Sequence, residues 1–467
     1  MLYNFERMEL IEKDEMELAE FSLQEALRLG VKAASVTLNK SVSDTCIMRD
    51  GIMDNIQHRL DRNLTFRFFS HGHFGSFSTN RLNSNDLQVF IGKAVQILNL
   101  MEADPCRQLP PEECMAKDAA EGYEAGLWDS RYYETNEKER LGKLSLMHLG
   151  NACGESWKLV SEENEYSDYA VATVHLDSRG YKMMHFESGF TCSSDITIIT
   201  DSGVRFSAYW WEISSYKDGI DPKHCAQTAL NKAVASIGPM KVESGGKTMV
   251  VDGNVASKLL SPIVDALSCM SIQQNMSFLC DSLGKRIFPE GLNLYDHARA
   301  KYKAGAKWFD TEGAATKNLA LIENGVVKNY FTNTWAANKT GMERTNTDIS
   351  RPVLKKWLSG SLTKGKEVLQ SEGKRLSLTT IIGLCGDGIY VTDFNGGNCN
   401  SVTGDFSFGV AGFVFEDGKI GKPIREMLIT GNILDLWNAL LAVGDDARDC
   451  GGAWRLPSIA FASVNFS

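Results

Sequence analysis

Two groups of side chains in this sequence have residue types and spacing that could support chemistry. The first is the pair His71 and His73, separated by Gly72. If a strand continued through them, both imidazoles would lie on one strand face and could begin a metal site. No third ligand follows at a suitable spacing, and the alternative is a glycine-containing turn that leads into the next strand.

The second group is a pair of carboxylates, Asp310 and Glu312, within the segment 309–313. Alternation would place both on one face, where such a pair could act as general acid and base. The same residue types also hold turns by accepting hydrogen bonds, and we favour this structural role. The sequence contains no phosphate-binding loop and no Gly-x-Ser-x-Gly motif.

The glycine-rich stretch 395–423 must position several further polar side chains. It passes into an alternating apolar run and then into Asp417-Gly418, a pair typical of a hairpin turn. This pattern predicts a bulged, twisted strand, because glycine allows sharp bends and close backbone approach. Its polar residues are expected to hold a buried turn or to line a cleft, and the candidates are Asn400, Thr403, Gly404, Asp405, Ser407 and Gly409.

The same stretch resembles the C-terminal signature of the TldD/PmbA family, whose members are known as modulators of DNA gyrase. The resemblance continues in order along nearly the whole chain. It rests on the segments 400–407, 409–413 and 418–420, and on the further segments 309–313, 323–326, 429–432 and 443–446.

The resemblance implies a zinc peptidase family with two branches. The catalytic branch, TldD, carries His-Glu-x-x-x-His on the helix that follows a strand like residues 247–251, so that two imidazoles bind zinc and the glutamate activates water. The helix predicted over 256–269 has no histidine and no glutamate; its only acid is Asp265, and Pro262 lies within it. We therefore assign no catalytic residue and no metal ligand to this chain.

Cys450, in the segment 449–452, is a further candidate that the resemblance provides. The catalytic branch completes its zinc site with a cysteine near its C-terminus, and Cys450 could occupy the corresponding position. A lone thiolate does not hold zinc with useful affinity, so a free, partly buried thiol is the alternative.

Resemblance to the PmbA (TldE) branch implies a non-catalytic subunit of a metalloprotease that degrades or processes small or unfolded peptides. It implies a TldD-like catalytic partner that brings the zinc, with no cofactor bound by this chain. A homodimer is a possible form of the chain when it is alone. Two alternatives remain open. One is a stand-alone metallopeptidase that uses scattered ligands such as His71, His73 and Cys450, and the other is a homodimeric peptide-binding regulator.

Composition limits the partners and the compartment. The net charge of −10 and the pI near 5.4 argue against direct binding to nucleic acid. A basic run at 351–375 is the exception, which we interpret first as a solvated face and second as a partner surface. Eleven scattered cysteines without a Cys-x-x-Cys pair, an acidic N-terminal segment and no long apolar run predict a cytoplasmic protein outside the membrane.

The order of the predicted elements indicates an α+β fold. Residues 1–240 are expected to form one domain, in which two segments, each a helix followed by an antiparallel meander, share a sheet. A linker or long surface loop at about 104–130 joins the two segments. Residues 241–467 are expected to form a second domain rich in antiparallel strands, with a barrel as one possible closure. A helix predicted over 433–442 interrupts these strands.

Overall fold

The computed structural model describes residues 10–117, 125–363, 375–448 and 452–467. The chain divides into two compact units. The first unit contains Met1–Asn231 together with Ala298–Lys317 and Thr332–Thr347, and the second contains Lys232–His297, Asn318–Phe331 and Asp348–Ser467. Two short segments from the second half of the sequence are thus part of the first unit.

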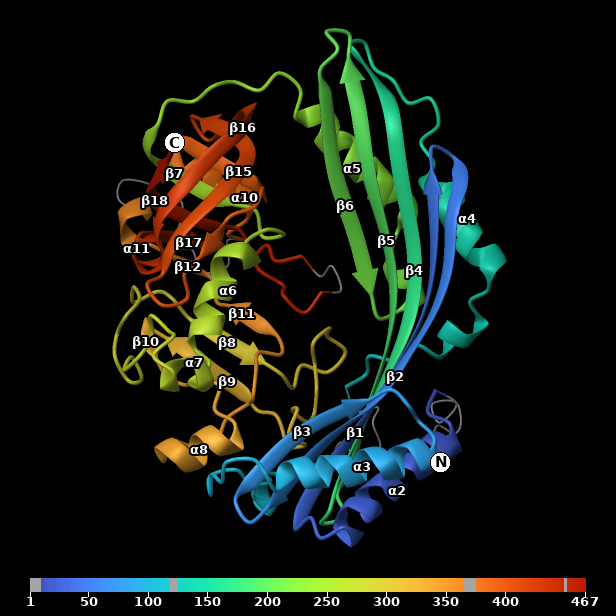
Figure 1. The fold of residues 1–467 in the computed structure, drawn as a ribbon. Coiled ribbons are helices and arrows are strands. Elements are labelled where there is room, and N and C mark those ends of the chain that lie inside the picture. The colour runs from blue at the N-terminus through green and yellow to red at the C-terminus, as the bar shows by residue number, and fades with distance from the viewer. Residues whose placement is uncertain (1–9, 118–124, 364–374, 449–451) are drawn as a thin grey trace. The chain divides into compact units, whose positions relative to one another are not determined.

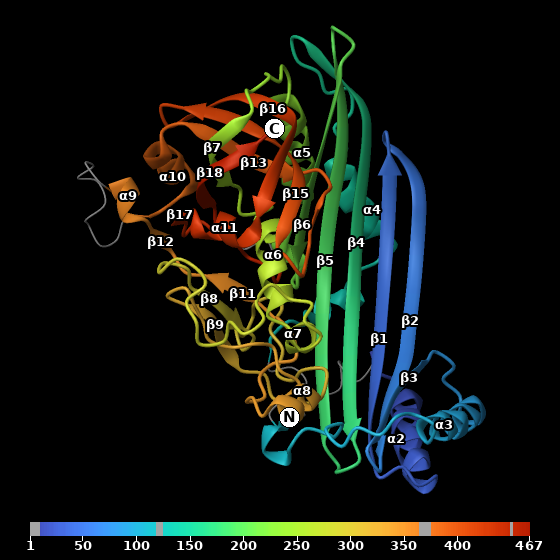
Figure 2. The ribbon, with the colours of Figure 1, turned by 60° about the vertical axis from the view of Figure 1, so that its left-hand side comes forward.

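A six-stranded antiparallel sheet forms the first unit, in the order β3-β2-β1-β4-β5-β6. Its long strands run side by side in Figure 2. Both predicted meanders contribute three strands each, and they join through pairing of β1 with β4, so the prediction of one shared sheet is confirmed. The strands are β1 (Ala33–Arg49), β2 (Ile52–Ser70), β3 (His73–Thr79), β4 (Trp157–Asp177), β5 (Lys182–Thr200) and β6 (Arg205–Ser214).

Helices cover one face of this sheet. Side chains of the helices and of alternate strand positions, such as Val36, Phe66 and Val174, form a single hydrophobic core. The intervening positions Thr37, Arg67 and His175 must then point to the opposite face, because successive strand side chains alternate. The helices are α2 (Lys13–Arg28), α3 (Ser84–Leu98), α4 (Glu137–Met147) and α5 (Pro222–Ala235), and α2 and α3 lie side by side in Figure 1.

Loop segments complete the first unit. The described part of the predicted linker at 104–130 is tied down, since Asp104 N donates to Gly72 O (2.8 Å) and Ala116 N donates to Gly313 O (3.2 Å). The remaining elements are short: η1 (Glu112–Cys114), η2 (Ser130–Glu134), η3 (Lys217–Gly219) and α8 (Thr334–Thr340).

A closed five-stranded barrel lies at the centre of the second unit, which confirms the expected α+β class with a barrel-like C-terminal part. The sheet path β18-β16-β15-β13-β7 closes because β7 also pairs with β18. Only β7 and β13 among these neighbours are parallel. The barrel strands are β7 (Gly245–Val251), β13 (Gly388–Phe394), β15 (Asp405–Glu416), β16 (Lys419–Asn432) and β18 (Ile459–Phe466).

Short elements extend the barrel. β17 (Leu440–Val443) pairs with β18 and with β12 (Trp357–Leu358), and β14 (Asn398–Cys399) pairs with β15. A second, four-stranded sheet has the order β10-β9-β8-β11, from Val326–Val327, Asn318–Glu323, Leu294–His297 and Pro352–Leu354. The helices of this unit are α6 (Ser257–Ala266), α7 (Cys269–Gln273), α9 (Gly360–Thr363), α10 (Leu378–Cys385) and α11 (Ile433–Asn438).

The structure differs from the sequence prediction where pairing overrides local signals. β5 is one continuous strand from Lys182 to Thr200, because β4 pairs along its whole length. Gly189 within it makes room for the Tyr169 ring, since a Cβ there would lie 2.1 Å from that ring. The helix predicted over 433–442 ends at Asn438, and the apolar residues after it form β17.

Within the described residues, no helix is both long enough and apolar enough to cross a membrane.

Candidate functional site

Helix α6 is the place where the family resemblance locates the metal-binding motif. It follows β7, and its residues Leu259, Leu260 and Ile263 are completely buried. The opposite side of the helix therefore faces outward. Ser257, Lys258 and Ser261 line a surface cavity of about 350 Å³ together with Trp454. Ser257, Lys258 and Ser261 are therefore the groups that this helix offers to a ligand.

The residues at α6 do not fit a zinc ion. Serine hydroxyls and an ammonium group are not the thiolate, imidazole or carboxylate ligands that zinc uses. The Lys258 ammonium donates to Gly397 O (3.3 Å) and lies 5.0 Å from the centre of the Phe408 ring, so a positive charge already occupies this surface. Across the described ranges, no cluster of three or more His, Cys, Asp or Glu side chains could hold a metal.

His71 and His73 lie at a hairpin turn and not along one strand face. β2 ends at Ser70 and β3 begins at His73, and His71 has a positive φ of 53°. The imidazoles have separate partners: His71 Nδ1 is 3.1 Å from Ser70 Oγ, and His73 Nδ1 is 2.5 Å from Met101 O. The alternative of a glycine-containing turn is confirmed, and no strand continues through both residues, because the chain reverses at Gly72. Cys450 lies outside the described residues.

Asp310 and Glu312 both bind the guanidinium of Arg344. Arg344 Nη2 donates to Asp310 Oδ2 (2.6 Å) and to Glu312 Oε2 (3.0 Å). Asp310 also accepts from the main-chain N–H groups of Glu312 (3.0 Å) and Ala314 (3.1 Å), which are the expected turn hydrogen bonds. Burial raises the pKa of Asp310, and Arg344 opposes that shift. A carboxylate pair committed to one buried arginine is suited to holding a loop.

The Asn400 side chain holds the turn that precedes β15. Its Oδ1 accepts from the N–H groups of Val402 (2.8 Å) and Thr403 (3.2 Å), and Gly404 has a φ of 82°. Asp405 accepts from Thr403 Oγ1 (2.7 Å) and Asn432 Nδ2 (3.0 Å), and the Thr403 hydroxyl is the main group that lowers the pKa of Asp405. These hydrogen bonds hold the turn, but the expectation of a buried turn is wrong, because Asn400, Thr403 and Asp405 are exposed.

Ser407 and Gly409 have different roles in β15. Ser407 is exposed and pairs with Thr430 on β16, whereas Phe406 and Phe408 on either side are buried. A Cβ at Gly409 would lie 2.5 Å from Asn395 O, so only glycine fits there. These positions shape the strand, and neither provides a reactive group in a cavity.

The basic run at 351–375 is not uniformly a solvated face. Arg351 is only 4% exposed, which makes that interpretation wrong at this position. Lys356 pairs with Asp445 at 2.9 Å. Residues 364–374 lie outside the described part of the chain.

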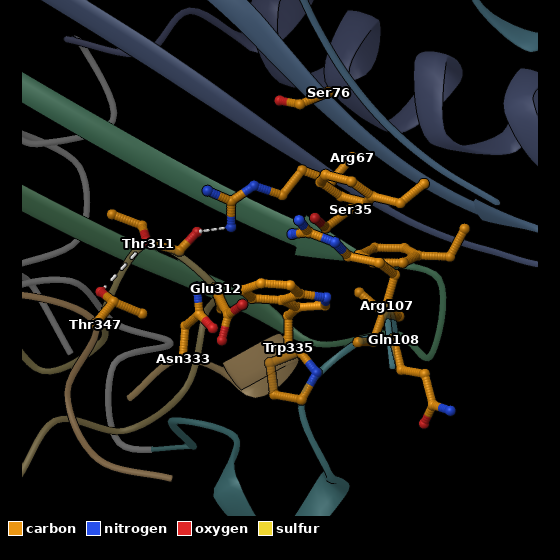
Figure 3. Close-up of a pocket in the computed structure, with 14 residues that line it drawn as sticks. Ser35, Arg67, Ser76, Arg107, Gln108, Thr311, Glu312, Asn333, Trp335 and Thr347 are labelled. Atoms are coloured by element: carbon orange, nitrogen blue, oxygen red, sulfur yellow. Dashed lines mark hydrogen bonds between the residues drawn. The ribbon is translucent and has the colours of Figure 1, made fainter. Parts of the chain in front are cut away.

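A polar cavity that the sequence analysis missed lies in the first unit (Figure 3). Its volume is about 330 Å³, and its lining includes Arg67, Arg107, Thr311, Glu312 and Trp335. Arg67 reaches the cavity because it alternates with the core residues Phe66 and Phe68, a signal readable from the sequence. Arg107 and Trp335 come from loops far apart in sequence, and no local pattern brings them together.

Comparison with known proteins defines the class of this chain. Residues 244–467 match the PmbA/TldA metallopeptidase C-terminal domain. A proposed modulator of DNA gyrase from Bacteroides thetaiotaomicron is 33% identical in sequence, with a TM-score of 0.87 over 98% of this chain and 99% of that chain.

Two further relatives extend the match over most of the sequence. Metalloprotease PmbA of Escherichia coli O157:H7 is 24% identical over 455 residues, covering 94% of this chain and 96% of that protein. TldE from Thermococcus kodakarensis has the same fold, with a TM-score of 0.76 at 17% identity over 96% of this chain and 100% of that one. The chain belongs to the TldD/PmbA metalloprotease family.

Proposed function

We propose that this chain is a non-catalytic subunit of a TldD-type metalloprotease that acts on small or unfolded peptides. The observation that carries the proposal is the outward side of α6, which presents Ser257, Lys258 and Ser261 on the helix that the family resemblance matches to the metal-binding helix of the catalytic branch. Zinc and the glutamate base would then come from a partner chain bearing His-Glu-x-x-x-His. A cytoplasmic location fits the ten described cysteines, all of which are free thiols.

An exposed strand edge in the first unit supports the need for a partner. β3 pairs with β2 only from Leu64 to Ser70, so the earlier part of β2 has no neighbour on that side within the described chain. Ile52, Ile56 and Leu60 of this part are 74%, 51% and 49% exposed. An unpaired edge that carries apolar side chains favours association with another chain.

Co-expression tests the assembly directly. The tagged chain is produced with and without the TldD-like protein of the same genome, and the complex is purified, analysed for metal and assayed with an unfolded peptide. We expect zinc and cleavage only in the sample that contains both chains. A partner-free preparation that binds one divalent ion per chain and cleaves peptides would refute the proposal, and so would failure to recover the two chains together.

Matched variants locate the interface. Ile56→Asp places a charge on the exposed edge of β2 and is expected to weaken co-purification at least tenfold. Val89→Asp, on α3, changes a side chain that is 59% exposed but lies away from that edge, and it should leave the complex intact. Equal behaviour of the two variants would exclude the β2 edge as the contact surface.

A further inference from the structure

Arg107 is held in the polar cavity of the first unit by two aromatic rings. The carbon at the centre of its guanidinium lies 4.3 Å from the centre of the Trp335 ring and 5.0 Å from that of Phe74. Figure 3 shows the guanidinium over the Trp335 indole, on the wall from which Arg67 also projects. The N–H donors of a guanidinium lie along its edge, so ring contacts with its centre leave them available to a ligand.

Neither nearby carboxylate neutralises Arg107. Within the described residues, no carboxylate oxygen lies within ion-pair distance of its guanidinium. Asp104 accepts instead from Trp335 Nε1 (2.6 Å) and from Cys106 N (2.9 Å). Glu312 accepts from the Thr334 hydroxyl (2.6 Å) and from Arg344 (3.0 Å).

Burial lowers the pKa of Arg107, and the charges of Asp104 and Glu312 oppose that shift. Arg140 in the same unit behaves in the opposite way, because its hydrogen bonds to Asp168 raise its pKa. Arg107 therefore bears a partly desolvated positive charge, and no described carboxylate forms an ion pair with it.

Arg67 adds a second cation to the same wall. Its Nη1 donates to the main-chain carbonyl of Thr311 at 2.5 Å, which fixes the side chain but leaves its charge unpaired by any described carboxylate. Lys339 lies 4.9 Å from the Trp335 ring and adds positive potential beside the stack. A planar anion is the ligand that two oriented guanidinium groups recognise best, since each can donate two parallel hydrogen bonds.

We propose that the cavity lined by Arg67, Arg107 and Trp335 binds a carboxylate group of a peptide. The carboxylate is either the C-terminal group or an acidic side chain, and both have the same planar chemistry. The inference that a peptide bears this carboxylate rests on the proposed function, whereas the inference that the ligand is an anion rests on the cavity alone. This site would let the chain select among peptides without taking part in cleavage.

Titration calorimetry of the full chain at low salt tests the proposal with four short peptides. These are acetyl-Ala-Ala-Ala as the free acid, its amide, acetyl-Ala-Glu-Ala amide and acetyl-Ala-Gln-Ala amide. At least one charged peptide should bind on the order of tenfold more tightly than its neutral counterpart. Preference for the free acid identifies the C-terminus as the ligand, and preference for the Glu peptide identifies the side chain. Absence of binding, or equal binding of charged and neutral forms, overturns the proposal.

Variants assign the binding to this cavity. Arg107→Gln should remove the preference for the charged peptide, and Arg107→Lys should retain part of it. Arg59→Gln changes an exposed residue of β2 that does not line the cavity, and it should not alter the preference. Circular dichroism checks that each variant is folded. Equal losses in Arg59→Gln and Arg107→Gln, or no loss in Arg107→Gln, refute the site. If the chain still assembles with its TldD-like partner while failing these tests, only this inference falls.

Discussion

His175 should make the stability of the first unit sensitive to acid. The side chain lies on β4 and is only 1% exposed. Its Nδ1 is 2.9 Å from Thr37 Oγ1, and its Nε2 is buried without a hydrogen-bond partner in the described chain. Burial lowers the pKa of His175 to about 3, and the charges of Arg67 and Arg179 add to the shift.

The direction of the pH effect on stability follows from which state, folded or unfolded, binds the proton first. Because the folded state has the lower pKa, the unfolded state takes up the proton first, and stability falls as the pH drops through the unfolded value near 6.5. Between pH 7 and pH 5, this one residue should remove about 2 kcal/mol of unfolding free energy. The loss stops growing only below pH 3, where the folded state is protonated as well.

Urea unfolding at the two pH values measures the effect. His175→Phe keeps an aromatic ring of similar size but cannot titrate, so its unfolding free energy should change with pH by about 2 kcal/mol less than that of the wild type. Leu87→Val, a change to a fully buried side chain of the same unit that adds and removes no titratable group, serves as the control and should lower stability without altering the pH dependence. An unchanged pH dependence in His175→Phe would refute the reasoning.

Three further predictions test the packing within each unit. Arg344→Met leaves the carboxylate of Asp310 buried without its cation, so the free energy of unfolding should fall by about 3–5 kcal/mol. Adding Asp310→Asn should restore most of that loss. Urea unfolding of the single and double variants measures both effects, and additive losses would contradict the pairing. Gly412→Ala would place a Cβ 1.9 Å from Tyr390 O, so the barrel should fail to form, as judged by soluble yield and circular dichroism; a stable variant would show that β15 can shift. Trp437→Phe removes the 3.1 Å hydrogen bond from the indole to a buried carbonyl of α6. The free energy of unfolding, measured by thermal unfolding, should fall by about 1–3 kcal/mol, and an unchanged stability would contradict this.

The sequence predicted those features that depend on local pattern. Alternation and turn residues indicated the two meanders and their common sheet, and the Asp417-Gly418 turn lies between β15 and β16 as expected. The barrel was foreseen only as a possibility, because its closure depends on pairing of β7 with β18, which no local signal encodes. The polar residues from Asn400 to Asp405 were recognised as turn-holding residues, since asparagine and threonine side chains are typical of such turns.

The cavity around Arg107 could not have been predicted in the same way. Arg107 lies in a proline-rich loop, and Trp335 lies in α8, more than two hundred positions later in the sequence. Their contact depends on the inclusion of Thr332–Thr347 in the first unit, which is a property of the whole fold. Glu312 was singled out from its spacing, but the spacing could not show that its hydrogen bonds come from Thr334 and Arg344.

Closure of the barrel by β18 has a consequence for the order of events during synthesis. β7 emerges from the ribosome near residue 250, whereas the strand that covers its second edge is translated only at residues 459–466. A growing polypeptide therefore carries β7 with this edge uncovered until residues 459–466 have been translated, and such an edge favours aggregation. Chaperone demand should accordingly be highest for nascent chains stalled just before residue 459.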